Sequence, residues 1–162
     1  MASVLLANII NLGFNLIINL ALPKYLPVDS YAAVKTFTLM VSYAGVFHFG
    51  YEDGMYLKYG GKKLEEINTA NWKLNISTLR IFQLAVACCI LTAGIISGNT
   101  VLVIFSLVLL PYNMIMYFKQ FYQATGEFKL YGYIMNLTSI LLFLADMLLI
   151  CLGVQAYVWY LA

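Results

Sequence analysis

The chain has 162 residues, of which 63% are hydrophobic and 10% are charged, with a net charge of +2 and a mean hydropathy of +0.86. This composition excludes an ordinary soluble domain and predicts a membrane protein. The basic residues are few and scattered rather than clustered, which argues against a nucleic-acid partner.

Apolar stretches fill most of the chain, and five of them are long enough for the hydrocarbon core, which takes about 20 residues to cross. They cover about residues 3–22, 31–50, 76–97, 101–122 and 131–152, and residues 155–162 look like the start of a sixth. We therefore expect an all-α, polytopic transmembrane helix bundle in which residues 1–162 form a single transmembrane region.

The first stretch carries asparagines on one helical face. Asn8, Asn11, Asn15 and Asn19 are separated by three, four and four residues, which brings their carboxamides to one side of a helix. Such amides either form hydrogen bonds between helices or line a hydrated groove that binds a ligand rich in hydroxyl groups. Four amides on one helix favour the groove.

The second stretch places Lys35, Ser42 and Asp53 on one face, together with Tyr31 and Phe49, if its helix continues through Gly50. The stem of Lys35 is long enough for its ammonium group to reach the membrane surface. Alternatively, Lys35 faces the cavity and attracts a phosphate group.

The inner end of the second stretch contains two adjacent acidic residues, Glu52 and Asp53. Adjacent side chains point about 100° apart on a helix, which excludes a matched catalytic pair. We expect a helix cap or an ion pair with Lys58 or Arg80. Gly50 and Gly54 have the spacing of a close helix contact, which is a weak signal, and no metal partner is expected for His48.

The fourth and fifth stretches each carry one polar line. Ser106, Asn113, Tyr117 and Gln120 share a face of the fourth, beside Pro111, which is expected to kink the helix. In the fifth, Gly132, Ser139, Asp146 and Gly153 follow one another every seven residues. This second line favours a close-packing seam, with Asp146 as a weaker candidate for an ion site.

Basic residues are unevenly divided between the two sides. Seven lie in or beside the second and fourth connections, against two, Lys24 and Lys35, at the first. Because Lys and Arg are retained in the cytoplasm, the N-terminus is predicted to be cytoplasmic.

Motifs of enzymatic chemistry are lacking in the sequence. It has no glycine-rich phosphate loop, no His-Glu-x-x-His pattern and no serine-nucleophile elbow. Cys88, Cys89 and Cys151 lie in apolar stretches and suggest neither a disulfide framework nor a metal site. We expect no enzyme, no cofactor and no metal.

Three segments together resemble a known transporter family. They are residues 22–31 (LPKYLPVDSY), 49–60 (FGYEDGMYLKYG) and 121–131 (FYQATGEFKLY). They look like the opening and the fourth-to-fifth helix connection of polysaccharide transporters, the O-antigen flippase (Wzx-like) group of the multidrug/oligosaccharidyl-lipid/polysaccharide exporter superfamily. The similarity extends over nearly the whole chain, although its motifs are loose patterns.

This resemblance implies a transporter of two six-helix lobes around a central, often cationic cavity. It would move undecaprenyl-diphosphate-linked oligosaccharide across the bacterial inner membrane by alternating access, for O-antigen, lipopolysaccharide or other polysaccharide synthesis. Membrane lipids and polysaccharide polymerase machinery would be its partners, and this chain would be an incomplete N-terminal lobe. Related drug antiporters typically have an acidic residue in the first helix, which is lacking here, so the coupling ion stays open.

The sequence thus gives two sets of candidate residues. The candidates for lining a substrate cavity are Asn8, Asn11, Asn15, Asn19, Lys35, Ser42, Asn113, Tyr117 and Gln120, and the candidates for ion coupling are Asp53 and Asp146. One alternative is a cation-coupled drug or metabolite antiporter of the same superfamily. The other is a small membrane scaffold that packs through Gly50, Gly54 and the line from Gly132 to Gly153.

Overall fold

The computed structural model describes residues 2–161, and for residues 2–4, 6 and 7 it describes the backbone only. Its α-helices are α1 (Ala2–Tyr25), α2 (Val28–Ser42), α3 (Tyr51–Tyr59), α4 (Thr69–Ser97), α5 (Thr100–Ala124) and α6 (Phe128–Cys151). Three short 3-10 helices accompany them: η1 (Ala44–His48), η2 (Leu64–Glu66) and η3 (Tyr157–Leu161). No β-strand occurs among residues 2–161, which confirms the all-helical prediction.

Three of the described helices, α4, α5 and α6, are long and apolar enough to cross a membrane. Their length and composition are compatible with a membrane-embedded protein, but the predicted count of five spans and the start of a sixth is not confirmed. Residues 157–161, expected to begin the sixth span, form the 3-10 helix η3, whose Tyr160 and Leu161 are buried against α2 and α5.

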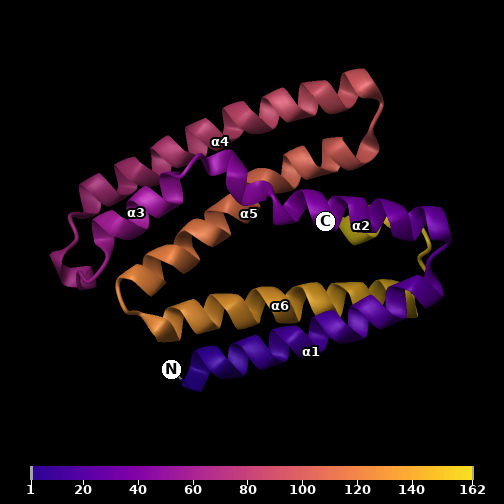
Figure 1. Ribbon diagram of the computed structural model, residues 1–162, viewed down its shortest axis with the longest axis horizontal. Coiled ribbons are helices and arrows are strands. Elements are labelled where there is room, and N and C mark those ends of the chain that lie inside the picture. Colours follow the sequence, from indigo (N-terminus) through magenta and orange to yellow (C-terminus); the bar gives the residue numbers. More distant parts are fainter. Residues whose placement is uncertain (1, 162) are drawn as a thin grey trace.

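Helix α5 is the centre of the structure. It contacts α2, α3, α4 and α6 and the short helices η1 and η3. Helix α5 runs back along α4 after a tight turn, while α1 lies beside α6 in a separate layer, where Phe14 and Phe143 stack with their ring centroids 4.2 Å apart (Figure 1). The four helices α1, α2, α5 and α6 therefore enclose a space between two layers.

Asparagine caps explain where the two helices of the α4–α5 hairpin begin. The Asn68 side chain accepts hydrogen bonds from the backbone N–H groups of Ala70 and Asn71, and the Asn99 side chain accepts one from Leu102. Such caps satisfy backbone donors that have no partner in the first helical turn. Helix α5 then continues through Pro111 to Ala124.

The second apolar stretch is not one helix. Its polar face was predicted on the condition that the helix continues through Gly50, and this condition is not met. Helix α2 ends at Ser42, η1 follows, and Phe49 and Gly50 both adopt left-handed backbone angles, with φ of 49° and 76°. We call residues 43–50 the break. Because the break turns the chain, Asp53 does not continue the face of Lys35 and Ser42, and its side chain is exposed.

The predicted close contact through Gly50 and Gly54 is wrong. A Cβ atom built on either glycine meets no heavy atom within 4 Å. The close approach occurs instead at Gly94 of α4, where a Cβ atom would lie 3.0 Å from both the backbone nitrogen and the Cγ2 atom of Val103.

Candidate functional site

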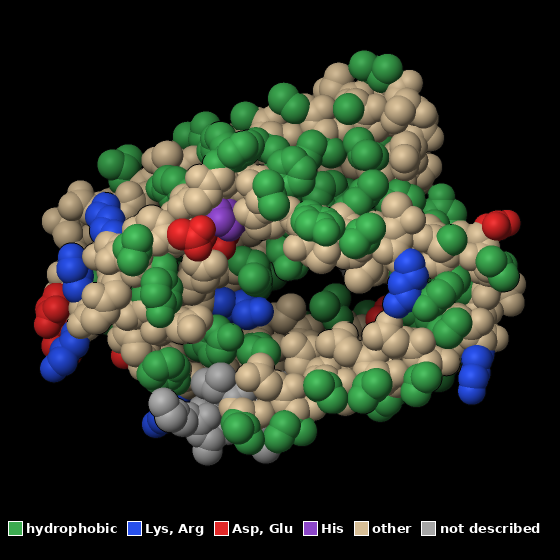
Figure 2. All heavy atoms as spheres, in the orientation of Figure 1, with side chains coloured by type: hydrophobic (Ala, Val, Ile, Leu, Met, Phe, Trp, Pro, Cys, Tyr) green, Lys and Arg blue, Asp and Glu red, His purple; other side chains and the backbone are tan. Residues whose placement is uncertain are grey.

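A groove with polar and apolar walls lies between the two layers. Its cavity volume is about 360 Å³. The space-filling view shows this face of the molecule hollowed between the α1–α6 layer and α2 (Figure 2). The lining comes from α1, α2, α5, α6 and η3, and its polar members are Asn11, Asn15, Thr38, Lys119, Thr138, Ser139, Asp146 and Tyr160.

Helical periodicity explains why two helices can supply a continuous wall. On α1 the lining residues are Asn11, Phe14, Asn15 and Ile18, which follow the three- and four-residue spacing of one helical face. On α6 they run from Met135 to Asp146 in the same way. The outer faces of these helices carry exposed leucines such as Leu16 and Leu144, as expected next to lipid.

Two charged side chains of opposite sign line the groove. Lys119 lies five residues before the end of α5, near the turn into α6, while Asp146 lies five residues before the far end of α6. The two residues therefore lie towards opposite ends of the groove. Neither forms an ion pair with another side chain in the part of the chain that the structure describes. Sequence reasoning did not select Lys119, because it belongs to no polar stripe of the fourth stretch.

The asparagines of α1 divide into three environments. Asn11 and Asn15 line the groove, and the Asn15 carboxamide donates a hydrogen bond of 3.0 Å to Asn11. Asn19 accepts a hydrogen bond from Lys35, and Asn8 is exposed. Of the four asparagines predicted to share one face, only the middle two, Asn11 and Asn15, line the groove.

Lys35 lies outside the groove lining. Its ammonium group donates a 2.6 Å hydrogen bond to the side-chain oxygen of Asn19 and lies 5.3 Å from the ring centroid of Tyr31. These contacts tie α2 to α1 near the connection between them. The Lys35 ammonium group, considered on sequence grounds for binding a phosphate, is thus in contact with Asn19 and Tyr31.

Replacing Lys35 with methionine is expected to lower the free energy of unfolding by less than about 1 kcal/mol. The hydrogen bond is exposed, and exposed charge and cation–π contacts are worth about 0.5–1 kcal/mol. Denaturant unfolding in detergent, followed by circular dichroism, measures this difference. A loss above about 2 kcal/mol would show that Lys35 has a structural role that its exposed contacts do not explain.

The polar line of the fourth stretch lies largely in the protein core, away from the groove. Asn113 is fully buried and donates hydrogen bonds to the Gln83 side chain at 2.9 Å and to the Ala44 carbonyl at 3.3 Å. Gln83 in turn donates to the Phe47 carbonyl at 3.1 Å. These bonds hold the break against α4 and α5, because irregular backbone needs side-chain partners.

Tyr117 and Ser106 lie in the same core face of α5. Tyr117 is fully buried among the aromatic side chains of α3, α4 and α5, and Ser106 donates to the Val103 carbonyl within its own helix. Gln120 is half-buried, and Ser42 is exposed and donates to the Leu39 carbonyl. None of these four residues lines the groove.

The acidic pair does not form the expected contacts with Lys58 or Arg80. Glu52 is 1% exposed, and its Oε2 atom lies 3.8 Å from Nε2 of His48, four residues earlier. The four-residue spacing of His48 and Glu52 was the sequence signal that could have revealed this pair, but His48 was considered only for metal binding and was not connected with Glu52. The structure describes no cluster of three or more metal-ligating side chains in residues 2–161.

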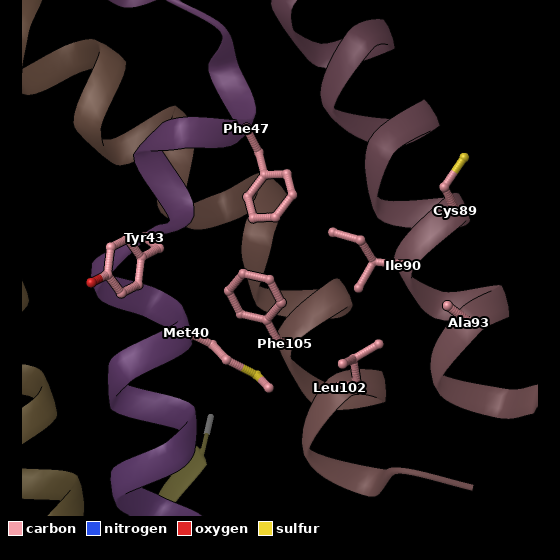
Figure 3. A pocket seen from close by; sticks show the side chains of 8 residues that line it. All are labelled: Met40, Tyr43, Phe47, Cys89, Ile90, Ala93, Leu102 and Phe105. Carbon is pink, nitrogen blue, oxygen red and sulfur yellow. The ribbon is translucent and has the colours of Figure 1, made fainter. Parts of the chain in front are cut away.

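A second, larger cavity of about 440 Å³ is almost entirely apolar. It lies on the other side of α2 from the groove, and Phe47, Phe105 and Met40 point into it (Figure 3). The remaining lining residues are Tyr43, Cys89, Ile90, Ala93 and Leu102. It contains no charged side chain, so it offers a hydrocarbon chain a surface but provides no group for recognising a polar ligand.

Comparisons with known proteins give no match, whether with protein-family models, with curated proteins or with solved structures.

Proposed function

We propose that this chain is one lobe of a membrane transporter that moves a lipid-linked oligosaccharide between the two leaflets, and that the groove receives the polar headgroup. The observation that carries the proposal is a groove lined by amides, hydroxyls and a lysine inside a helical molecule with exposed apolar outer faces. Polar groups facing lipid would cost several kcal/mol each, so such a lining is stable only around water or a polar ligand.

Each part of the groove suits one part of such a substrate. Carboxamides and hydroxyls donate to and accept from sugar hydroxyls, which fits Asn11, Asn15 and Ser139. The ammonium group of Lys119 is a cation without an ion-pair partner among the described side chains, and it fits a diphosphate. The apolar cavity on the other side of α2 offers a surface for part of the lipid chain.

The membrane arrangement belongs to the same proposal. Helices α1, α4, α5 and α6 each cross the bilayer once, and α2, η1 and α3 together form one broken crossing beside α5. The charged side chains gather mostly at the ends of the molecule, as this arrangement requires (Figure 2). With the N-terminus in the cytoplasm of a bacterium, the connection between α3 and α4 faces inward, where its lysines favour the cytoplasmic side.

Binding of undecaprenyl diphosphate to the purified full chain in nanodiscs tests the proposal. Native mass spectrometry is expected to show that the chain binds undecaprenyl diphosphate. It is expected to show no binding of undecaprenol, which lacks the phosphates. Lys119→Met is expected to weaken binding about tenfold, since a charge-assisted contact is worth about 1.5–3 kcal/mol. Equal binding of both lipids, or no effect of Lys119→Met, would overturn the proposal.

Matched variants separate the groove from the surface. Lys129→Met changes an exposed lysine at the start of α6, and Asn8→Leu changes an exposed amide of α1. Both are expected to leave binding unchanged, whereas Asn15→Leu is expected to weaken it. In a cell that lacks its own flippase, the reading frame containing this chain should restore surface polysaccharide with the control variants and less with the groove variants.

A cation-coupled exporter is the second candidate, and the position of Asp146 in the groove favours it. A carboxylate there would attract a cationic drug or a coupling ion. Asp146→Asn would then abolish efflux of a cationic dye while leaving the binding of undecaprenyl diphosphate intact. The opposite pattern, with lipid binding dependent on Lys119 and no dye efflux, supports the flippase.

A further inference from the structure

Glu52 and His48 form a buried ionisable pair that the groove does not use. Glu52 shares the buried face of α3 with Met55 and Tyr59, and this face packs on α5. The three residues have the three- and four-residue spacing of a helix interface. The packing of α3 on α5 therefore also keeps the Glu52 carboxyl group away from solvent.

The pair has unused hydrogen-bonding capacity. Oε1 of Glu52 and Nδ1 of His48 are buried and have no hydrogen-bond partner among the described residues. The closest atoms of the two side chains, Nε2 and Oε2, are 3.8 Å apart, and closing by about 1 Å would bring them within ordinary hydrogen-bond distance. A hydrogen held between Nε2 and Oε2 would join the two side chains directly, while Oε1 and Nδ1 stay free to accept or donate further hydrogen bonds.

The balance of charge decides how many protons the pair holds. With a neutral imidazole and an ionised carboxylate, the pair carries one negative charge in the protein interior, at a cost of several kcal/mol. The first-turn position of Glu52 on α3 favours a negative charge by only about 0.3–1 kcal/mol. One added proton removes the net charge, whether it resides on the carboxyl group or on the imidazole.

We infer that His48 and Glu52 form a proton-binding site that takes one proton from water near neutral pH and holds it between the two side chains. No bond other than the new O–H or N–H bond forms, and the proton returns to water on release. This inference does not depend on which ligand the groove binds.

Neighbouring groups on every packed element are compatible with this site. Helix α5 contributes the phenols of Tyr112 and Tyr117, and α4 contributes the uncharged amide of Gln83, while Arg80 is exposed. The other titratable residues of α3 are Tyr51, Asp53, Tyr56, Lys58 and Tyr59, of which Asp53, Tyr56 and Lys58 are exposed. No lysine or arginine of the described residues forms an ion pair with Glu52, so none supplies a buried counter-charge in place of the proton.

The location of the pair gives its proton a structural consequence. His48 ends η1 and Glu52 lies in the first turn of α3, so the two side chains stand on either side of the left-handed residues Phe49 and Gly50. A non-glycine residue such as Phe49 in this region costs about 1–2 kcal/mol. A proton shared between the two side chains adds a contact across the break to the hydrogen bonds that Gln83 and Asn113 donate to it.

The single histidine of the chain makes the test direct. With ¹⁵N-histidine and ¹³C-glutamate labels, NMR of the full chain in nanodiscs reports the His48 ring and the Glu52 carboxyl group from about pH 5 to 9, which brackets an ordinary histidine. We expect the wild-type pair to release its proton at a higher pH than His48 does in Glu52→Gln, by about one pH unit or more. Asp29→Asn, which removes an exposed carboxyl group in the first turn of α2, far from the break, should leave the wild-type midpoint in place.

Three results would overturn the inference. The first is an identical His48 titration in the wild type and in Glu52→Gln. The second is an ionised Glu52 beside a neutral His48 at pH 7. The third is a midpoint that moves when sodium replaces potassium at constant ionic strength, which would assign the site to a metal cation. If Glu52→Gln loses its helical circular dichroism, the same test is made with His48→Gln. The glutamate titrations of the wild type and of this variant are then compared, and the one glutamate signal whose midpoint moves is that of Glu52.

Discussion

Replacing Asn113 with leucine is expected to lower the free energy of unfolding by about 1–3 kcal/mol, although the two side chains have similar volumes. The change leaves the Gln83 side-chain oxygen and the Ala44 carbonyl oxygen without their donor inside the core. A buried polar atom without a partner costs about 1–3 kcal/mol. Denaturant or thermal unfolding in detergent measures the loss.

A double-mutant cycle with Gln83→Leu tests whether the two amides act as a unit. Each single variant removes the hydrogen bond between the two amides and leaves one of them buried without it, whereas the double variant removes both amides, so its loss should be smaller than the sum of the single losses by about 1 kcal/mol. Thr92→Val is the control, because Thr92 is exposed and donates only to the Cys88 carbonyl of its own helix. Additive losses would contradict the proposed network.

Adding a methyl group at Gly94 is expected to destabilise the α4–α5 hairpin. In Gly94→Ala the new Cβ atom would lie 3.0 Å from the backbone nitrogen of Val103, so one helix must move. Overpacking of this kind costs about 1–3 kcal/mol, which exceeds the gain of about 1 kcal/mol in helix propensity. We expect a net loss of up to about 2 kcal/mol and a lower midpoint of thermal unfolding.

Gly54→Ala is the matched control, because the same change is made on a helix with open space. No heavy atom lies within 4 Å of the new Cβ atom, and the backbone of Gly54 is helical. This variant is expected to gain up to about 1 kcal/mol from helix propensity. If Gly94→Ala and Gly54→Ala changed the free energy of unfolding in the same direction, the difference in packing between the two glycines would be refuted.

The break was beyond the reach of sequence reasoning for a physical reason. Residues 43–50 contain no proline, and their two glycines, Gly45 and Gly50, each weaken a helix by only about 1 kcal/mol. The partners that stabilise the turn, Gln83 and Asn113, come from two other helices. Local sequence therefore gave only a small penalty for continuing the helix, and the prediction placed Asp53 on a face to which it does not belong.

The candidate site was foreseen in part. The spacing of the asparagines on α1 correctly placed Asn11 and Asn15 on one face, and both line the groove, while Asn8 and Asn19 of the same stripe do not. Lys119 was not foreseen, because a single lysine shows no periodicity. The groove also depends on Asp146 of α6, which sequence reasoning had placed on a packing seam.

The sequence by itself determined that the chain is helical and suited to a membrane, because apolar surroundings require every backbone donor and acceptor to be paired within the segment. It also determined which side chains share a helical face. Only the tertiary structure decided what each face meets: Asn113 meets Gln83, Glu52 meets His48, and Asn15 meets a groove. The spacing of residues fixes the direction of each side chain around its own helix axis, whereas the contacts of that side chain depend on how separate helices pack against one another.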